Sequence, residues 1–290
     1  MATLAEVSGE LRLLLEGAAF FEGPRWHEGR WWVSDFYRHA VFTVDADGRE
    51  EKVLTVEGQP SGLGWLPDGS LLVVSMKDRR LLRRAPSGEV SVHAEVGEFC
   101  GGPLNDLVVD ANGRAFVGNF GFDLMEREEP KPTGLIRVDP DGSTALAAED
   151  LLFPNGTVIT DDGRTLIVGE TYGRRYTAFT LDHDGALVDR RTWAEIPAIA
   201  PDGCTMDAEG HIWSADARGG RACRLAPGGA IVEEIAAPEG LQFFACMLGG
   251  DDGRTLLLCA APDFSERQRS EARESVLLTT TVDAPHAGLP

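Results

Sequence analysis

A polar residue followed by glycine and then by a short run of alternating apolar residues recurs six times along this chain. The glycines of these six turns are Gly29, Gly69, Gly113, Gly163, Gly210 and Gly253. Asp-Gly or Asn-Gly between alternating apolar segments is a strong signal of a β-hairpin, because the turn residues must tolerate positive φ angles. A spacing of roughly 45 residues is typical of architectures in which each repeat is one supersecondary unit. The pattern therefore predicts six hairpin-containing units.

In most repeats a second strand and turn follow the hairpin, so each unit holds about four strands, the size of a propeller blade. The sequence predicts an all-β fold, a single-domain six-bladed β-propeller over residues 1–290 with four-stranded antiparallel blades. Segments 11–17 and 275–283 are expected to pair and close the ring, which removes an exposed sheet edge. Residues 121–133 and 262–273 are expected to be surface loops. A pair of β-sandwiches is the rival architecture, but no two-fold division of the composition and no linker supports it.

The charge and the cysteines limit the classes of partner. The formal net charge is −20, and Lys52, Lys77 and Lys131 are the only lysines among 27 basic residues, so nucleic acid is not an expected partner. Residues 1–17 lack the features of a signal peptide, and no apolar run is long enough to span a membrane, so we expect a soluble, cytoplasmic protein with no membrane partner. The five cysteines form no C-x-x-C pair, which favours reduced thiols. We expect a monomer or a weak oligomer.

The repeat places polar residues at the axis of the propeller. The first strand of each blade lines the central channel, so equivalent positions near the start of these strands face one another. Eight residues before each turn glycine, or seven in the first repeat, stand Glu22, Ser61, Asn105, Asn155, Asp202 and Ala245. No hydrophobic core would select this set. Asn and Asp before Gly are also common in ordinary turns, but each repeat already has a separate turn signal.

Two carboxylates and two amides that converge on a water-accessible channel suit a divalent cation. Like charges a few ångströms apart resist ionisation, and a cation relieves that repulsion. The available donors are oxygens, with no His or Cys among the six residues, so hard ions such as Ca²⁺, Mg²⁺ or Mn²⁺ are favoured over a dedicated zinc centre. Three or four protein oxygens leave positions for water or substrate, which is the arrangement that catalysis requires.

At these residues the sequence resembles the senescence-marker-protein/gluconolactonase family of regucalcin-like six-bladed propellers. The resemblance covers essentially the whole chain. It is carried by residues 21–26 (FEGPRW), 104–106 (LND), 153–156 (FPNG), 200–204 (APDGC) and 246–250 (CMLGG).

The resemblance implies a metal ion held by Glu22, Asn155 and Asp202, with Asn105 as a further ligand or a substrate contact. One divalent ion is expected, Ca²⁺ first, with Mg²⁺, Mn²⁺ or Zn²⁺ as alternatives. Asp202 is also the expected catalytic acid or base. Members of the family act as sugar lactonases, other lactonases or phosphotriesterases, and distant propeller relatives include strictosidine-synthase-like proteins that use no metal.

Pro103 departs from the pattern of the family. Sugar lactonases of the family often carry an arginine two residues before the asparagine, where its guanidinium can grip substrate hydroxyls, and proline supplies no donor. The departure argues against an aldonolactone as the natural substrate. Pro103 and Phe120 are therefore expected to border the substrate, and Phe99, Leu104 and Phe122 nearby suggest a more apolar pocket, although such residues more often serve blade packing.

The predicted function is a divalent-metal-dependent hydrolase of a small lactone or ester. The metal would polarise the ester carbonyl, and Asp202 would activate water, protonate the leaving alkoxide or attack directly. The sequence contains no G-x-S-x-G, H-E-x-x-H or Walker motif, so other hydrolase schemes find less support. The alternatives are a phosphotriesterase-like enzyme, a pathway-specific propeller enzyme of secondary metabolism, and a non-enzymatic propeller that binds calcium or a small ligand.

Overall fold

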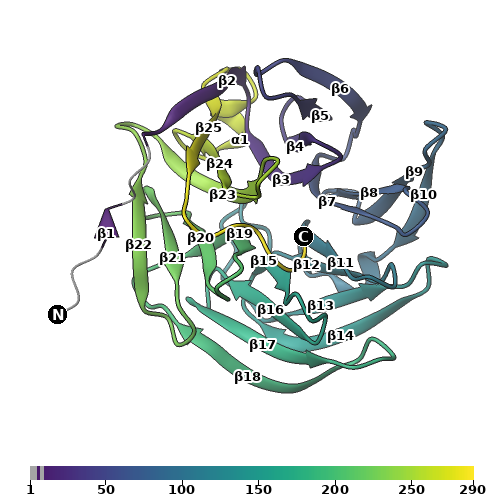
Figure 1. Ribbon diagram of the computed structural model, residues 1–290. Helices are drawn as coiled ribbons and strands as arrows, with labels where there is room; N and C mark the ends of the chain where they lie inside the picture. The colour runs from purple at the N-terminus through teal and green to yellow at the C-terminus, as the bar shows by residue number, and fades with distance from the viewer. Residues whose placement is uncertain (1–4, 7–9) are drawn as a thin grey trace.

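Six β-sheets surround one axis like the blades of a propeller (Figure 1). The structure, a computed structural model, describes residues 5–6 and 10–290, so the signal-peptide prediction for residues 1–17 falls partly outside it. The first strands of neighbouring blades contact one another all the way round the ring. In each blade the later strands follow outward as antiparallel neighbours. The predicted six-bladed propeller of four-stranded blades is confirmed.

The first three blades contain β3 to β14. Blade 1 comprises β3 (Phe21–His27), β4 (Arg30–Asp35), β5 (Ala40–Val44) and β6 (Glu50–Thr55). Blade 2 comprises β7 (Pro60–Trp65), β8 (Leu71–Ser75), β9 (Arg80–Arg84) and β10 (Val90–Glu95), followed by the 3-10 turn η1 (Gly97–Phe99). Blade 3 comprises β11 (Leu104–Val109), β12 (Ala115–Asn119), β13 (Thr133–Val138) and β14 (Thr144–Leu151).

The other three blades contain the remaining strands. Blade 4 comprises β15 (Pro154–Ile159), β16 (Thr165–Glu170), β17 (Arg175–Leu181) and β18 (Leu187–Glu195). Blade 5 comprises β19 (Pro201–Met206), β20 (Ile212–Asp216), β21 (Arg221–Leu225) and β22 (Ile231–Ala236), with the two-residue β1 (Ala5–Glu6) added in parallel to β22. Blade 6 comprises β23 (Gln242–Gly249), β24 (Thr255–Ala261), β25 (Ser275–Thr281) and β2 (Arg12–Ala18).

The two ends of the chain close the ring in blade 6. β2 pairs antiparallel with β25, with Arg12 opposite Thr279 and Leu13 opposite Leu278. The closure predicted from segments 11–17 and 275–283 is therefore confirmed. It joins the N-terminal strand to the last blade and leaves no unpaired blade at the seam.

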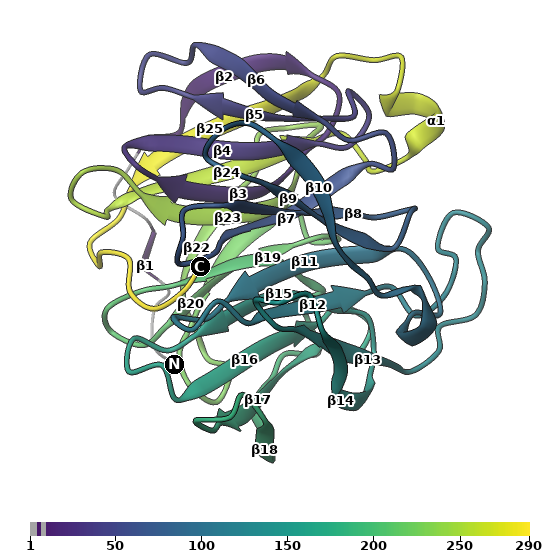
Figure 2. The ribbon, with the colours of Figure 1, turned by 90° about the vertical axis from the view of Figure 1, so that its right-hand side faces the viewer.

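The turn signals mark real hairpins. All six turn glycines have positive φ angles, for example 74° at Gly29 and 79° at Gly69. Residues 121–132 form a strand-free connection between β12 and β13, as predicted, whereas the stretch 262–273 contains the short helix α1 (Glu266–Arg269), which the turn signals do not indicate. Figure 2 shows α1 and the β12–β13 connection at one end of the ring and the C-terminal tail at the other.

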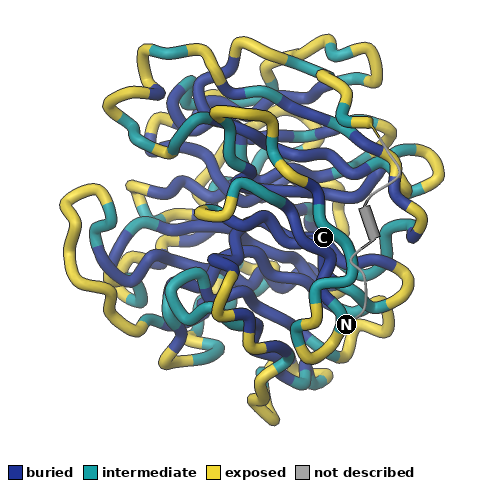
Figure 3. Tube along the Cα trace, turned by 90° about the vertical axis from the view of Figure 1, so that its left-hand side faces the viewer, coloured by how far each residue is buried: buried dark blue, intermediate teal, exposed yellow. Residues whose placement is uncertain are grey.

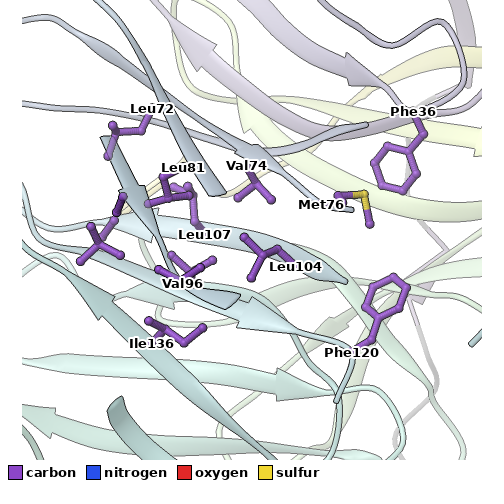
Figure 4. Packing of buried hydrophobic residues seen from close by; sticks show 14 of the residues in the cluster. Phe36, Leu72, Val74, Met76, Leu81, Val96, Leu104, Leu107, Phe120 and Ile136 are labelled. Carbon is purple, nitrogen blue, oxygen red and sulfur yellow. The ribbon is translucent and has the colours of Figure 1, made fainter. Parts of the chain in front are cut away.

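The core lies between the blades, where their faces pack on each other. The burial pattern follows this arrangement: strands near the axis are buried and the outer turns are exposed (Figure 3). Between blades 2 and 3, Val74, Leu81, Leu104 and Leu107 pack together, and Phe120 lies at the end of the same cluster (Figure 4). No helix among the described residues is long and apolar enough to cross a membrane.

The C-terminal tail crosses the end of the ring that is opposite α1. Leu289 exchanges two backbone hydrogen bonds with Ile159 of blade 4, and His286 forms a bridge with Asp207 of blade 5. The last residue lies near the axis in Figure 1. At this end of the ring the tail lines a cavity together with Arg25.

Candidate active site

Four of the six axial residues line one cavity at the α1 end of the ring. Glu22, Asn105, Asn155 and Asp202 are the second residues of β3, β11, β15 and β19, and the cavity has a volume of about 90 Å³. The convergence that the repeat alignment predicts is therefore found in the structure. The two other aligned positions, Ser61 and Ala245, are buried in the inner strands and are not among the described residues that line this cavity.

Local backbone geometry turns these side chains toward the axis. In each of the four strands the pairing register shifts directly beyond the polar residue, as between Pro154 and Thr157 in β15 and between Pro201 and Cys204 in β19. A bulge of this kind re-aims side chains next to active sites. A Cβ atom on Gly156 would lie 2.4 Å from the backbone oxygen of Asp202, so only glycine permits this approach of β15 to β19. The glycine after the asparagine serves strand packing and not a turn.

Hydrogen bonds fix the orientation of the Asn155 amide. Its Nδ2 donates to Asp202 Oδ1 at 2.5 Å and to Thr171 Oγ1 at 3.2 Å, and the Thr171 hydroxyl in turn donates to the carbonyl of Pro201 at 2.7 Å. Both donor hydrogens of the amide are therefore used, and Oδ1 accepts no hydrogen bond from any side chain or backbone group that the structure describes. This oxygen is available to a ligand.

Burial makes the two carboxylates of the cavity costly to ionise together. Burial, and after it the charge of Asp202, raises the pKa of Glu22 well above its usual range. Burial raises the pKa of Asp202 to about 7, although the hydrogen bond from Asn155 lowers it. Glu22 also accepts a hydrogen bond from the backbone nitrogen of Gly23 at 2.7 Å. A cation between the carboxylates would relieve both penalties.

A buried ion pair lies below the cavity and does not neutralise these carboxylates. The Arg25 guanidinium is 2.6 Å from Asp106, and it also donates to the carbonyls of Pro24, Leu63 and Leu107. Both side chains are nearly inaccessible. Arg25 donates no hydrogen bond to Glu22 or Asp202, and its charge lowers the pKa of Glu22 less than burial and Asp202 raise it.

The donors fit a hard divalent cation. They comprise the carboxylates of Glu22 and Asp202 and the amide oxygens of Asn155 and Asn105, all of which suit Ca²⁺, Mg²⁺ or Mn²⁺. Within residues 5–6 and 10–290, no three or more His, Cys, Asp or Glu side chains are grouped for metal binding, so the amides are needed to complete a ligand set. Asn105 Nδ2 is buried without a hydrogen-bond partner among the described residues, which a bound substrate oxygen would satisfy.

Aromatic side chains form the wall above this polar floor. The wall consists of Phe20, Phe36, Tyr37, Phe120, Phe153, Tyr172, Phe244 and Phe264. Phe120 stacks on Phe153 with ring centroids 4.3 Å apart. At the rim, Met125 of the β12–β13 connection and Phe264 beside α1 are 45% and 43% exposed. The site is thus a small polar floor at the bottom of an aromatic cup.

The predicted substrate contacts have different positions. Phe120 lines the cavity, as does Asn105. Pro103 is not among the described lining residues, and its carbonyl accepts a hydrogen bond from the Phe120 nitrogen. Leu104 and Phe122 pack in the core behind the wall. Pro103 is therefore linked to the cavity wall through its hydrogen bond with Phe120.

Several lining residues could not be predicted from the repeat alignment because they do not lie on the first strands. They directly follow the second strand of a blade: Phe36 and Tyr37 after β4, Phe120 after β12, Thr171 and Tyr172 after β16, and Ala217 and Arg218 after β20. The second strand of a hairpin ends where the first begins, so these residues flank the axial set. Phe120 was expected from the sequence, and for the others the position directly after the second strand of blades 1, 4 and 5 would have been the signal.

A buried polar residue at the end of the second strand fixes several of these connections. Asp35 accepts hydrogen bonds from the backbone nitrogens of Tyr37 and Arg38. Asp216 accepts one from the nitrogen of Arg218 at 3.3 Å. These bonds hold the lining side chains at the mouth of the cavity.

Most of the chain matches one known protein family. Residues 20–262 match the family described as SMP-30/Gluconolactonase/LRE-like region. The chain belongs to this family. The pentonolactonase of Haloferax volcanii is 27% identical over 261 residues, which cover 88% of this chain and 86% of the relative.

Solved structures agree with this family assignment. A gluconolactonase from Xanthomonas campestris is 26% identical, with a TM-score of 0.76 and coverage of 95% of this chain and 90% of that one. A calcium-binding protein, regucalcin, from Agrobacterium tumefaciens has a TM-score of 0.82 at 22% identity and covers 100% of this chain and 99% of that one, which shows the shared fold.

Proposed function

We propose that this protein is a divalent-metal-dependent lactonase whose active site is the axial cavity. The observation that carries the proposal is the convergence of two buried carboxylates and two amides on the floor of one cavity, with no basic side chain among the described residues of that floor. The names of the relatives, a pentonolactonase and a gluconolactonase, support the reaction class. The ligands would be Glu22, Asn155 and Asp202, with Asn105 as a fourth ligand or a substrate contact.

A metal ion bound at this floor would supply Lewis-acid polarisation of the ester carbonyl. Asp202 would accept a proton from the attacking water and return one to the leaving alkoxide, so that the ester bond opens to one hydroxyl and one carboxylic acid, which releases its proton at neutral pH. Asn105 Nδ2, which lacks a partner among the described residues, would donate a hydrogen bond to a substrate oxygen. Asn155, held by Thr171, would keep its Oδ1 toward the cavity.

The wall supports a substrate less polar than an aldonolactone. A sugar lactone presents several hydroxyls that each need a partner, and most side chains above the floor are aromatic or aliphatic. The proline at position 103 supplies no donor, and only its carbonyl is engaged, with Phe120. Apolar γ- and δ-lactones would therefore react with a higher kcat/KM than gluconolactone. Calcium is the first candidate for the ion, with Mg²⁺, Mn²⁺ and Zn²⁺ as alternatives.

All five cysteines are free, and four of them are buried. This fits the expectation of a cytoplasmic protein, because reduced thiols persist in reducing compartments.

Lactone hydrolysis by variants of the floor would test the proposal. Asp202→Asn keeps the size of the side chain and should lower kcat on the best lactone by ~10²- to 10⁴-fold, the contribution of a positioned acid or base. The matched control is Asp251→Asn, which alters an exposed carboxylate in an outer turn and should leave kcat unchanged. Equal activity of Asp202→Asn and wild type would refute the assigned role. If an ion binds and raises the melting temperature but the protein hydrolyses no lactone, the result would instead indicate a non-enzymatic propeller that binds calcium or another ion.

A further inference from the structure

Arg218 is the one cationic side chain among the described residues that line the cavity. It directly follows Ala217 in the connection after β20, at the wall of the cup and away from the first strands that carry the acidic floor. Every other charged lining residue is an acid, namely Glu22 and Asp202. A single positive group in an otherwise aromatic wall gives the cavity two chemically different ends.

The guanidinium of Arg218 has no acidic partner in the part of the chain that the structure describes. Its neighbours on β21 are both paired, Arg221 with Asp216 at 3.2 Å and Arg224 with Asp207 at 2.7 Å. Asp216 uses its oxygens on the Arg221 side chain and on backbone nitrogens, including that of Arg218. Arg218 is exposed at the mouth of the cavity, and its guanidinium, which is paired with no carboxylate among the described residues, is available to a ligand.

Tyr172 is the aromatic residue that this exposed guanidinium contacts. The Arg218 Cζ atom lies 5.4 Å from the centre of the Tyr172 ring, and its Nη2 is 3.4 Å from the tyrosine hydroxyl. The Tyr172 ring is itself packed edge-on against Phe122 at 5.3 Å and against Phe153 at 5.4 Å. The contact with a supported ring orients the guanidinium in part, and its remaining N–H groups form a fork that matches a carboxylate.

We infer that the substrate is an apolar or aromatic lactone that carries a carboxylate, with Arg218 as the residue that selects it. The inference rests on the proposed lactonase function. The ester group would lie on the floor, the hydrocarbon body against the aromatic wall, and the carboxylate at Arg218. Hydrolysis adds one water across the acyl C–O bond, so a monocarboxylated lactone becomes a hydroxy-dicarboxylate and one proton is released at neutral pH.

A set of phthalides would test the inference. 5-Carboxyphthalide has an aromatic body, a five-membered lactone and a carboxylate, and 5-carbamoylphthalide is its neutral counterpart. We expect wild type to hydrolyse the carboxylate with the higher kcat/KM, mainly through a lower KM. Arg218→Ala should lower the ratio of kcat/KM for the carboxylate to kcat/KM for the carbamoyl compound by ~10-fold or more, the size expected for a hydrogen bond to a charged group. Arg218→Lys should restore part of this ratio.

The control is Arg254→Ala, which removes an arginine with no ion pair among the described residues from an outer turn of blade 6, and which should leave the ratio unchanged. Raising the ionic strength should reduce the wild-type preference. An Arg218→Ala ratio equal to that of wild type, or a wild-type preference for the carbamoyl compound, would overturn the inference. If neither phthalide nor any γ- or δ-lactone is hydrolysed with any ion, the lactonase proposal fails separately. The affinities of wild type and Arg218→Ala for 5-carboxyphthalide, measured by calorimetry, then test the anion site separately. Equal affinities refute the site, and an affinity ~10-fold weaker in the variant supports it.

Discussion

Replacement of Thr171 by valine removes the hydrogen bonds that orient Asn155, a candidate metal ligand, and leaves Asn155 itself unchanged. The Thr171 hydroxyl accepts from Asn155 Nδ2 at 3.2 Å and donates to the Pro201 carbonyl at 2.7 Å. Valine has nearly the same shape, so it removes both hydrogen bonds without opening a cavity. At about 1 kcal/mol for each bond, the free energy of unfolding should fall by about 1–2 kcal/mol.

A larger effect is expected on the affinity of the site for its metal ion. Without Thr171 the Asn155 amide is oriented by Asp202 alone, through the hydrogen bond of 2.5 Å. Loss of a partner that orients a ligand typically weakens metal binding by ~10-fold or more, about 1.4 kcal/mol. Calorimetric titration of chelated protein with Ca²⁺ measures this, or titration with whichever ion proves to bind most tightly. Thr171→Ser keeps the hydroxyl and should bind the ion as wild type does. The reasoning is refuted if Thr171→Val and Thr171→Ser have the same affinity.

Three further perturbations address the floor of the site. Gly156→Ala places a Cβ atom 2.4 Å from the backbone oxygen of Asp202. It should therefore lower the free energy of unfolding, measured by urea denaturation, by about 1–3 kcal/mol and reduce lactonase activity. An unchanged free energy of unfolding and unchanged activity would contradict the close approach of the strands. Arg25→Met leaves Asp106 buried without its partner and should destabilise by about 3–5 kcal/mol, part of which the double variant Arg25→Met/Asp106→Leu should recover; the pair is unimportant if the single variant is as stable as wild type. The stability of chelated protein should also depend on pH, because folding raises the pKa of Asp202 to about 7. The contribution of Asp202 to the free energy of unfolding is fully present below pH ~4 and is lost as the pH rises through 7, so wild type should gain stability relative to Asp202→Asn as the pH falls from 8 to 5. Parallel pH profiles of the two proteins would refute the shift.

The architecture and the floor of the site could be predicted from the sequence because one repeat encodes both. The turn glycines fix the period, and counting back from them reaches the same position on each first strand, which is why Glu22, Asn105, Asn155 and Asp202 can be grouped by sequence position alone. Closure by β2 and β25 followed from two strand-like segments left at the chain ends. The helix α1 was not foreseen, since a single turn of helix in a polar connection has no apolar periodicity.

The wall was harder to predict. Tyr172 and Arg218 belong to connections after second strands, whose register depends on where each strand ends, and strand ends are the least certain part of a sequence prediction. Pro103 was expected to border the substrate because sugar lactonases of the family often carry an arginine at this position, and in the structure its carbonyl accepts a hydrogen bond from Phe120, which lines the cavity. Pro103 precedes β11, which begins at Leu104, so the alternation of side chains along the strand does not fix where Pro103 points.

The central claim, a single ion held by the axial residues and required for lactone hydrolysis, is tested most directly by titrating chelated enzyme with one ion while the release of protons from the best lactone is recorded. The account predicts no hydrolysis above background after chelation, recovery that reaches its maximum at one ion per chain, and no recovery in Asp202→Asn. Full hydrolysis by chelated wild-type enzyme, or recovery of Asp202→Asn to the wild-type rate, would contradict it.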